Sequence, residues 1–203
     1  MSKIIRFFII IFLILDFEIR SEKVTNYNLA VIKFKNQSDY KGNWDIELEF
    51  AKLILNRLKE KGFTNIILVN EESNISKTNL LIISGVIKQF KFKENTIAFY
   101  RLGGYKNYSV GIKLEINIRG KVLNEVKNFE SYISRKEYGL ALFGGPGGSD
   151  DFEKPLYYEL QKIRFGSEEF WRSIYGEAVD DCFKKILEWS LKFLKSKNTF
   201  KEQ

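Results

Sequence analysis

The stretch YSVGIKLEINIRGKVL, residues 108–123, decides the fold that we expect for this chain. Apolar side chains occupy every second position from Val110 to Ile118, and charged or polar side chains lie between most of them. Alternation with a period of two is typical of a β-strand that has one face in the core and one in solvent. Gly120 and Lys121 are predicted to form a two-residue turn, after which residues 122–134 return as the partner strand. The sequence therefore predicts a long antiparallel hairpin.

Three further strands are predicted before the hairpin, over residues 28–35, 65–69 and 80–92. Residues 65–69 are almost all apolar, which is typical of a strand that is covered on both faces. The third strand changes from a continuous apolar run to alternation, which indicates one long strand with a kink at Gly85. Residues 94–107 are predicted to form a loop that carries aromatic side chains.

Two amphipathic helices are also predicted. The first begins at Asn43, a favourable N-cap residue, and the second runs from Ser167 to about Lys195. Their apolar residues recur at intervals of three and four. These residues are Leu48, Ala51, Leu55 and Leu58 in the first helix and Trp171, Ile174, Ala178, Cys182, Ile186 and Trp189 in the second. The order strand-helix-strand-strand-strand-strand-helix favours an α/β fold, with a mixed sheet of about five strands and helices packed on it.

Residues 136–166 are an irregular insertion in this domain, and part of it, GLALFGGPGGSDDFEK, resembles a phosphate-binding loop in its glycine content. A P-loop places a lysine after its glycines. Here Ser149, Asp150 and Asp151 follow the glycines, and the two carboxylates would repel a phosphate. The stretch therefore predicts a loop tip with apolar side chains and no phosphate site.

The first 21 residues have the pattern of a secretory signal peptide. A basic start precedes nine unbroken apolar residues at 7–15, whereas a membrane-spanning helix needs about 20 apolar residues. We therefore expect export, with residues 22–203 as one domain. The alternatives are a tether to the inner membrane formed by residues 4–19 and a buried amino-terminal strand.

The residue inventory excludes several kinds of catalytic site. The chain has no His and one Cys, which rules out zinc sites, Ser-His-Asp triads and Cys-His dyads. The pair Asp150 and Asp151 lies in a glycine-rich loop, which is a poor platform for catalysis, and Asp180 and Asp181 diverge on a helix. We therefore expect no enzyme, no cofactor and no metal. Hydrolysis of cell-wall glycan by Asp150 or Asp151 is the third hypothesis for function.

The charge and the aromatic residues point to the kind of partner. A formal net charge of +7 suits an anionic membrane surface, although a lysine-rich protein with no such partner has the same charge. No block of five like charges occurs, which argues against nucleic acid. We predict protein contacts through the edge of the hairpin and an exposed apolar set. This set is Phe99, Tyr100, Leu142, Phe143, Tyr157 and Tyr158.

Four stretches of the chain resemble a known envelope family. They are LAVIKFKNQSDYKGNW, LLIISGVIKQF, SVGIKLEINIRGKVL and YGEAVDDCFKKILEWSLKFL. Their order and their pattern of apolar positions and glycines are similar to the amino-terminal domain of TolB and its relatives. These relatives include the curli secretion channel lipoprotein and the outer-membrane activator of penicillin-binding proteins.

The resemblance spans residues 28–195, and it carries two departures. This chain has no Cys after the signal peptide to accept a lipid, and residues 136–166 are too few for the two membrane hairpins of the curli channel. The resemblance implies a non-catalytic periplasmic or outer-membrane-associated module that binds another envelope or secretion protein. The alternative is a homo-oligomer that forms part of an outer-membrane secretion channel or ring.

Overall fold

The computed structural model describes residues 28–72, 80–99, 103–120, 123–139 and 162–198. The elements in chain order are β1 (Asn28–Ile32), β2 (Lys35–Asn36), α2 (Ile46–Glu60), β3 (Ile66–Val69), β4 (Leu80–Phe99), β5 (Gly103–Arg119), β6 (Asn124–Gly139), α5 (Glu168–Arg172) and α6 (Ile174–Asn198). No helix within these ranges combines the length and the apolar character needed to cross a membrane.

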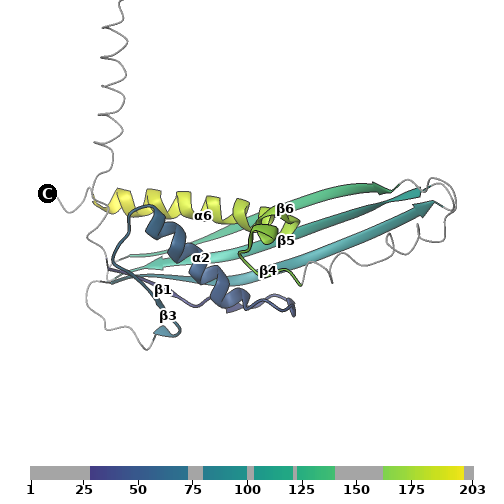
Figure 1. Cartoon of the computed structure of the whole chain (residues 1–203). Helices are drawn as coiled ribbons and strands as arrows, with labels where there is room; N and C mark the ends of the chain where they lie inside the picture. Colours follow the sequence, from purple (N-terminus) through teal and green to yellow (C-terminus); the bar gives the residue numbers. More distant parts are fainter. Residues whose placement is uncertain (1–27, 73–79, 100–102, 121–122, 140–161, 199–203) are drawn as a thin grey trace, which may run out of the picture.

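One mixed sheet organises the molecule, with the strand order β3–β1–β4–β5–β6 and with β2 paired to β4. β1 runs parallel to β3 and β4, whereas β4, β5 and β6 are antiparallel. The long helices α2 and α6 cover one face of this sheet, and the strands β4 to β6 continue beyond them (Figure 1). The structure confirms the predicted α/β fold with helices packed on a mixed sheet.

The core lies between the sheet and the two helices. Alternate residues of β5, from Val110 to Ile118, are almost completely buried there, as their spacing predicted. Trp44 joins the layers at one end, since its ring contacts Phe170 and Tyr175 at centroid distances of 5.3 and 5.0 Å. Its Nε1 donates a hydrogen bond of 2.8 Å to the carbonyl oxygen of Ile163.

The predicted loop over residues 94–107 was wrong. Residues 94–99 extend β4 and residues 103–107 begin β5, with pairing up to Phe99 opposite Gly103. This part of the hairpin projects past the helices (Figure 1). Its buried side carries charged residues, since Lys106 is 7% exposed and lies 3.8 Å from Glu94, so the sequence shows no clear apolar alternation here. The other turn also differs by one position, because Gly120 and Leu123 exchange both backbone hydrogen bonds and enclose residues 121–122.

The first helix begins two residues later than predicted. Asp45 is the N-cap of α2, and its side chain accepts a hydrogen bond of 3.2 Å from the backbone N–H of Leu48. Asn43 lies before the cap and Trp44 turns its side chain into the core. Leu48 is only half-buried. The buried face of α2 is Ile46, Phe50, Ala51, Ile54, Leu55 and Leu58.

The predicted second helix is two helices, α5 and α6, which are separated at Ser173. The N-cap at Ser167 is confirmed, with a hydrogen bond of 3.2 Å from the N–H of Phe170. Ser173 has an extended backbone, with φ −79° and ψ 162°. The bend brings Gly176 against α5, where a Cβ atom would lie 2.1 Å from the carbonyl oxygen of Phe170. A glycine at position 176 therefore permits this close approach.

Two predictions about the parallel strands also fail. β3 lies at the edge of the sheet. One of its faces is open to solvent, because Ile67 is 55% exposed, so β3 is not covered on both faces. The irregularity of β4 lies between Ile87 and Gln89, where the register with β5 shifts, and not at Gly85. Gly85 instead makes room for the ring of Phe34, since a Cβ atom there would lie 2.5 Å from Phe34 Cε2.

Candidate protein-docking surface

The structure describes little of the predicted partner-binding set. Phe99 is the last residue of β4, and its backbone is paired with Gly103. The other five residues of the set lie outside the described residues, as do Asp150, Asp151 and the predicted signal peptide. These assignments therefore stay predictions.

The acidic pair on α6 is held in ion pairs. Asp180 lies 2.6 Å from Arg57 of α2 and 2.6 Å from Lys184, and Asp181 lies 2.7 Å from Lys185. Partial burial opposes ionisation of Asp180, but hydrogen bonds from Lys184 and Arg57 outweigh it and hold the pKa of Asp180 below its ordinary value. A carboxyl group with a lowered pKa is a poor general acid at neutral pH.

A metal-binding cluster and a reactive thiol are both missing from the described residues. The described residues contain no group of three or more Cys, Asp or Glu side chains placed to hold a metal ion. Cys182 is completely buried in α6, and this burial raises the pKa of its thiol to about 12. Since the thiolate is the reactive form of cysteine, Cys182 is an inert core residue.

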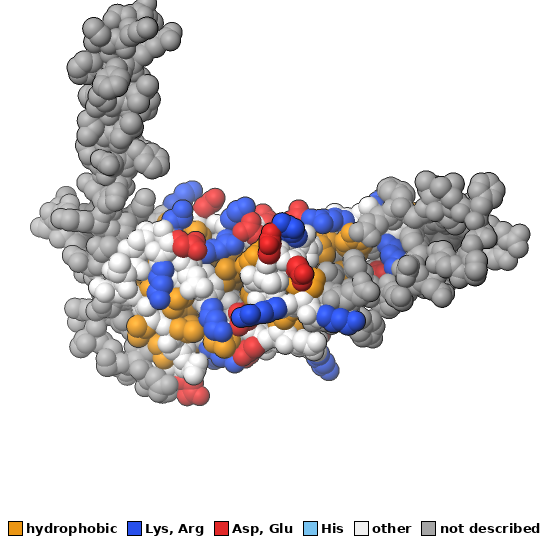
Figure 2. Space-filling view, viewed as in Figure 1, with side chains coloured by type: hydrophobic (Ala, Val, Ile, Leu, Met, Phe, Trp, Pro, Cys, Tyr) orange, Lys and Arg blue, Asp and Glu red, His pale blue; other side chains and the backbone are white. Residues whose placement is uncertain are grey.

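An open groove of about 690 Å³ runs between α2 and the segment from Phe165 to α6. Half-buried apolar side chains such as Leu53 and Trp171 line it, and charged side chains of both signs surround them. Figure 2 shows this helical face, where basic and acidic side chains are mixed and no large patch of one sign forms. The groove therefore has no single chemical preference that would select a ligand.

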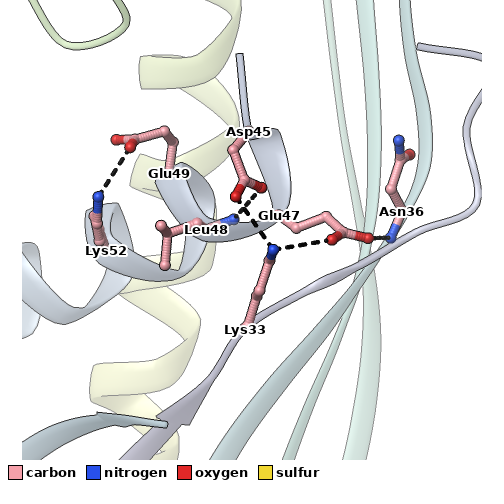
Figure 3. Close-up of polar contacts among 7 residues, drawn as sticks. All are labelled: Lys33, Asn36, Asp45, Glu47, Leu48, Glu49 and Lys52. Carbon is pink, nitrogen blue, oxygen red and sulfur yellow. Dashed lines mark hydrogen bonds and ion pairs between the residues drawn. The ribbon is translucent and has the colours of Figure 1, made fainter. Parts of the chain in front are cut away.

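A polar cluster joins β1 and β2 to the start of α2 (Figure 3). Lys33 Nζ lies 3.2 Å from Asp45 Oδ2 and 3.4 Å from Glu47 Oε2. Glu47 Oε1 also accepts a hydrogen bond of 2.8 Å from the backbone N–H of Asn36. The hydrogen bond to Asp45 raises the pKa of Lys33, partial burial opposes the rise and Glu47 adds to it. All of these groups satisfy one another, so the cluster is structural.

Two long unpaired strand edges remain among the described residues, namely residues 88–99 of β4, which lie beyond its pairing with β2, and the longer outer edge of β6. Within the part of the chain that the structure describes, β6 pairs only with β5 and no strand adjoins its other side. Its register with β5 is uninterrupted over sixteen residues, so no bulge disturbs this edge. Natural proteins usually shorten, bend or cover such edges because they can pair with another strand.

The pairing pattern shows which groups face this edge. Gly120 and Leu123 form a hydrogen-bonded pair. In an antiparallel ladder, hydrogen-bonded and non-hydrogen-bonded pairs alternate along the two strands. Counted along the register from Gly120, Lys113 and Glu130 form a non-hydrogen-bonded pair. The N–H and C=O groups of Glu130 therefore point away from β5. The same holds for Asn124, Val126, Asn128, Tyr132, Ser134 and Lys136.

The side chains of these residues lie on the face of the sheet opposite to α2 and α6. Tyr132 and Val126 are 69% and 51% exposed, and with Ile67 they are the exposed large hydrophobic side chains among the described residues. Tyr132 lies beside Gly111 of β5, where a Cβ atom would be 3.7 Å from its Cδ2. An aromatic ring over a strand glycine supports the sheet, but most of this ring remains open to solvent.

Charged side chains partly protect the free edge of β6 against pairing with other strands. From α6, Lys185 donates a hydrogen bond of 3.1 Å to the edge-facing carbonyl oxygen of Glu130. On the open face, Lys113 pairs with Glu130 at 3.3 Å. A lysine at a strand edge discourages uncontrolled pairing. Lys185 therefore occupies one carbonyl group of the β6 edge and does not cover the rest of this edge.

The sequence analysis named the edge of the hairpin as a contact surface, which stays a prediction, and it did not single out Tyr132 and Val126. The signal was present in NEVKNFESYISRK, residues 124–136, where polar side chains occur on both faces of a strand. Such a pattern is typical of an edge strand, in which neither face is fully covered. Two apolar residues at even positions of this stretch mark the face opposite to the core.

No protein-family model and no curated protein sequence matches this chain. Solved structures with some similarity include the PelC dodecamer from Paraburkholderia phytofirmans, with 12% identity over 61% of this chain and 78% of that chain and a TM-score of 0.33. Rare lipoprotein B from Shewanella oneidensis has 12% identity, covers 80% and 98% of the two chains and has a TM-score of 0.37. A minor lipoprotein from Acinetobacter baumannii has 8% identity, coverage of 80% and 89% and a TM-score of 0.37. Two of the three are named as lipoproteins, but at these TM-scores the similarity carries no argument about function.

Proposed function

We propose that this chain is a non-enzymatic module that binds protein through the free edge of β6 and the sheet face beside it. One observation carries the proposal, namely the uninterrupted edge of β6 with exposed Tyr132 and Val126 beside it. An added strand would form main-chain hydrogen bonds along the edge, and its alternate side chains would meet these two residues.

We further propose that the protein is exported and that its partner is an envelope or secretion component. The predicted signal peptide at residues 1–21 supports export, and the resemblance to TolB relatives supports the class of partner. The chemistry of α6 supports the non-enzymatic role, because Asp180 and Asp181 are bound in ion pairs and the thiol of Cys182 is buried.

Site-specific photocrosslinking in cells tests the docking surface. A photoreactive amino acid is introduced at Tyr132 or at Val126 of the full-length chain, and at Lys184 as an exposed control on the helical face. We expect crosslinked products from positions 132 and 126 and none from position 184. Equal products from all three positions, or none from β6, would overturn the proposal.

The intact mass of the same recovered protein tests export. A mass that is short by about the first 21 residues, found in the periplasmic fraction, is expected from a cleaved signal peptide. Full-length protein in the membrane fraction would instead support a tether formed by residues 4–19.

A further inference from the structure

We infer that one face of the sheet binds the surface of a membrane that contains anionic lipids. This face is the side of β4, β5 and β6 that points away from α2 and α6, and we call it the open face. It is a second surface beside the edge of β6. The inference therefore goes beyond the proposed function and does not rest on it.

The register of the three strands gathers lysine side chains on the open face. Val110 and Ile112 of β5 are buried on the helical side, so the residues that alternate with them face the other way. Their partners on β4 and β6 share this orientation. Four exposed lysines lie on the open face as a result, namely Lys91, Lys93, Lys113 and Lys136.

Acidic side chains do not neutralise these lysines. Within the described parts of β4, β5 and β6, the acidic side chains of the open face are Glu115 and Glu130. Each already lies near a lysine, since Glu115 is 3.7 Å from Lys88 and Glu130 is 3.3 Å from Lys113. The other three lysines of the face form no ion pair with any described residue. On the helical face, by contrast, basic and acidic side chains are mixed (Figure 2).

The centre of the open face is filled rather than hollowed. The ring of Tyr132 and the side-chain amide of Gln89 lie over Gly111, 3.7 and 2.8 Å from the place that a Cβ atom would take. Ser109, the next residue of this face along β5, is only 6% exposed. The filled centre therefore gives a single small anion no recess between the lysines.

The spacing of the lysines also favours an extended partner. Neighbouring strands are about 4.8 Å apart and alternate residues of one strand about 7 Å apart. The Cα atoms of Lys93 and Lys136 are therefore about 12 Å apart, on the two outer strands. A linear polyanion would follow one strand, whereas a plane of negative charges meets the lysines of both strands at once. Tyr132 lies among them and is 69% exposed, and tyrosine is favoured where a membrane meets water.

Membrane contact and strand addition at β6 are compatible. An added strand lies beside β6 in the plane of the sheet, whereas a membrane lies against the open face. The formal net charge of +7 agrees with attraction to an anionic surface. Lys91, Lys93 and Lys136 place part of this charge where it can act on lipid headgroups.

Cosedimentation with lipid vesicles tests the inference. The purified natural chain is mixed with vesicles of phosphatidylcholine alone, or of phosphatidylcholine and phosphatidylglycerol in equal amounts. We expect binding to the anionic vesicles only, and weaker binding at high salt. A lysine near an anionic surface contributes about fivefold to binding, so Lys91→Gln/Lys93→Gln/Lys136→Gln should bind about 100-fold more weakly.

Lys59→Gln/Lys184→Gln/Lys192→Gln is the matched control, because it removes the same charge from exposed lysines of α2 and α6. These positions are on the far side of the sheet, beyond a Debye length of about 10 Å at 0.1 M salt. We expect this variant to bind like the natural chain. Both variants keep residues 1–27 unchanged, so their comparison isolates the lysines. Their melting temperatures show whether each variant is folded.

Equal binding of the two variants to anionic vesicles would overturn the inference, as would equal binding of the natural chain to both kinds of vesicle. Lysines at strand edges also discourage pairing. If the open-face variant only self-associates in light scattering, without losing vesicle binding, edge protection is their role and the inference is wrong. It is also wrong if single-stranded DNA binds through these lysines and vesicles do not. None of these outcomes changes the crosslinking test of the β6 edge.

Discussion

Gly85 shows how one residue without a side chain sets the packing of the core. The ring of Phe34 lies over it and is only 2% exposed, so the ring has no free space into which it can move. A Cβ atom at position 85 would overlap three ring atoms within 2.7 Å. We expect Gly85→Ala to lower the free energy of unfolding by about 1–3 kcal/mol through overpacking, measured by urea denaturation.

Gly111 is the matched control, because it also lies in a central strand. A Cβ atom there would lie 2.8 Å from Nε2 of Gln89, which is the far end of a flexible, half-buried side chain. We expect Gly111→Ala to change the free energy of unfolding by about 0.5 kcal/mol or less. Equal losses from the two variants would show that Phe34 does not restrict position 85.

At the scale of single elements, the start of α2 depends on Asp45, which both caps the helix and binds Lys33. Asp45→Ala removes the acceptor for the N–H of Leu48, and we expect a loss of about 1 kcal/mol in the free energy of unfolding. Asp45→Asn keeps an acceptor oxygen and loses only the partly exposed ion pair, so most of the stability should remain. A loss in Asp45→Asn as large as in Asp45→Ala, in the same urea titration, would assign the effect to the ion pair.

At the scale of the whole molecule, Arg57 and Asp180 tie α2 to α6 across the helical layer. The folded state lowers the pKa of Asp180 despite the opposing effect of burial, so the ionised form stabilises the fold. This contribution is present above the ordinary pKa of aspartate, about 3.9, and is lost as the pH falls through the lower value in the folded protein. We expect Asp180→Asn to show a smaller fall in the free energy of unfolding between about pH 5 and pH 2 than the natural chain.

Glu188→Gln is the control for this pH dependence, because Glu188 is an exposed carboxylate of the same helix outside the cluster. Glu188→Gln removes one carboxylate of α6 without removing an ion pair between α2 and α6, so the slope with pH of its unfolding free energy is the reference for Asp180→Asn. If Asp180→Asn also kept that slope, the Arg57–Asp180 pair would not contribute to the acid sensitivity of the fold.

The elements that the sequence predicts well are those with one-sided burial. In β5, apolar residues alternate because one face meets the helices and the other does not. The end of the hairpin lacks this signal, so residues 94–107 were predicted as a loop. Similarly, the break at Ser173 depends on how α5 bends against Gly176, and helical periodicity continues across it unchanged.

The candidate site on β6 could also be predicted only in part from the sequence. Its place on the hairpin could be predicted, since a strand with polar residues on both faces is a candidate edge. The exposure of Tyr132 and the bond from Lys185 to Glu130 could not, because they depend on where α6 lies along β6. Glu130 and Lys185 are separated by 55 residues in the chain, so a local sequence pattern cannot indicate their contact.

The sequence by itself determined the α/β class, the buried face of β5 and the absence of histidine chemistry, because composition and periodicity are local properties. The tertiary structure alone decided which strands are neighbours. The order β3–β1–β4–β5–β6 leaves β6 with a free edge and exposes Ile67 on β3. Periodicity specifies which face of a strand is buried, but the partner of each strand is selected by contacts between distant segments. For this reason the docking surface is a property of the folded chain.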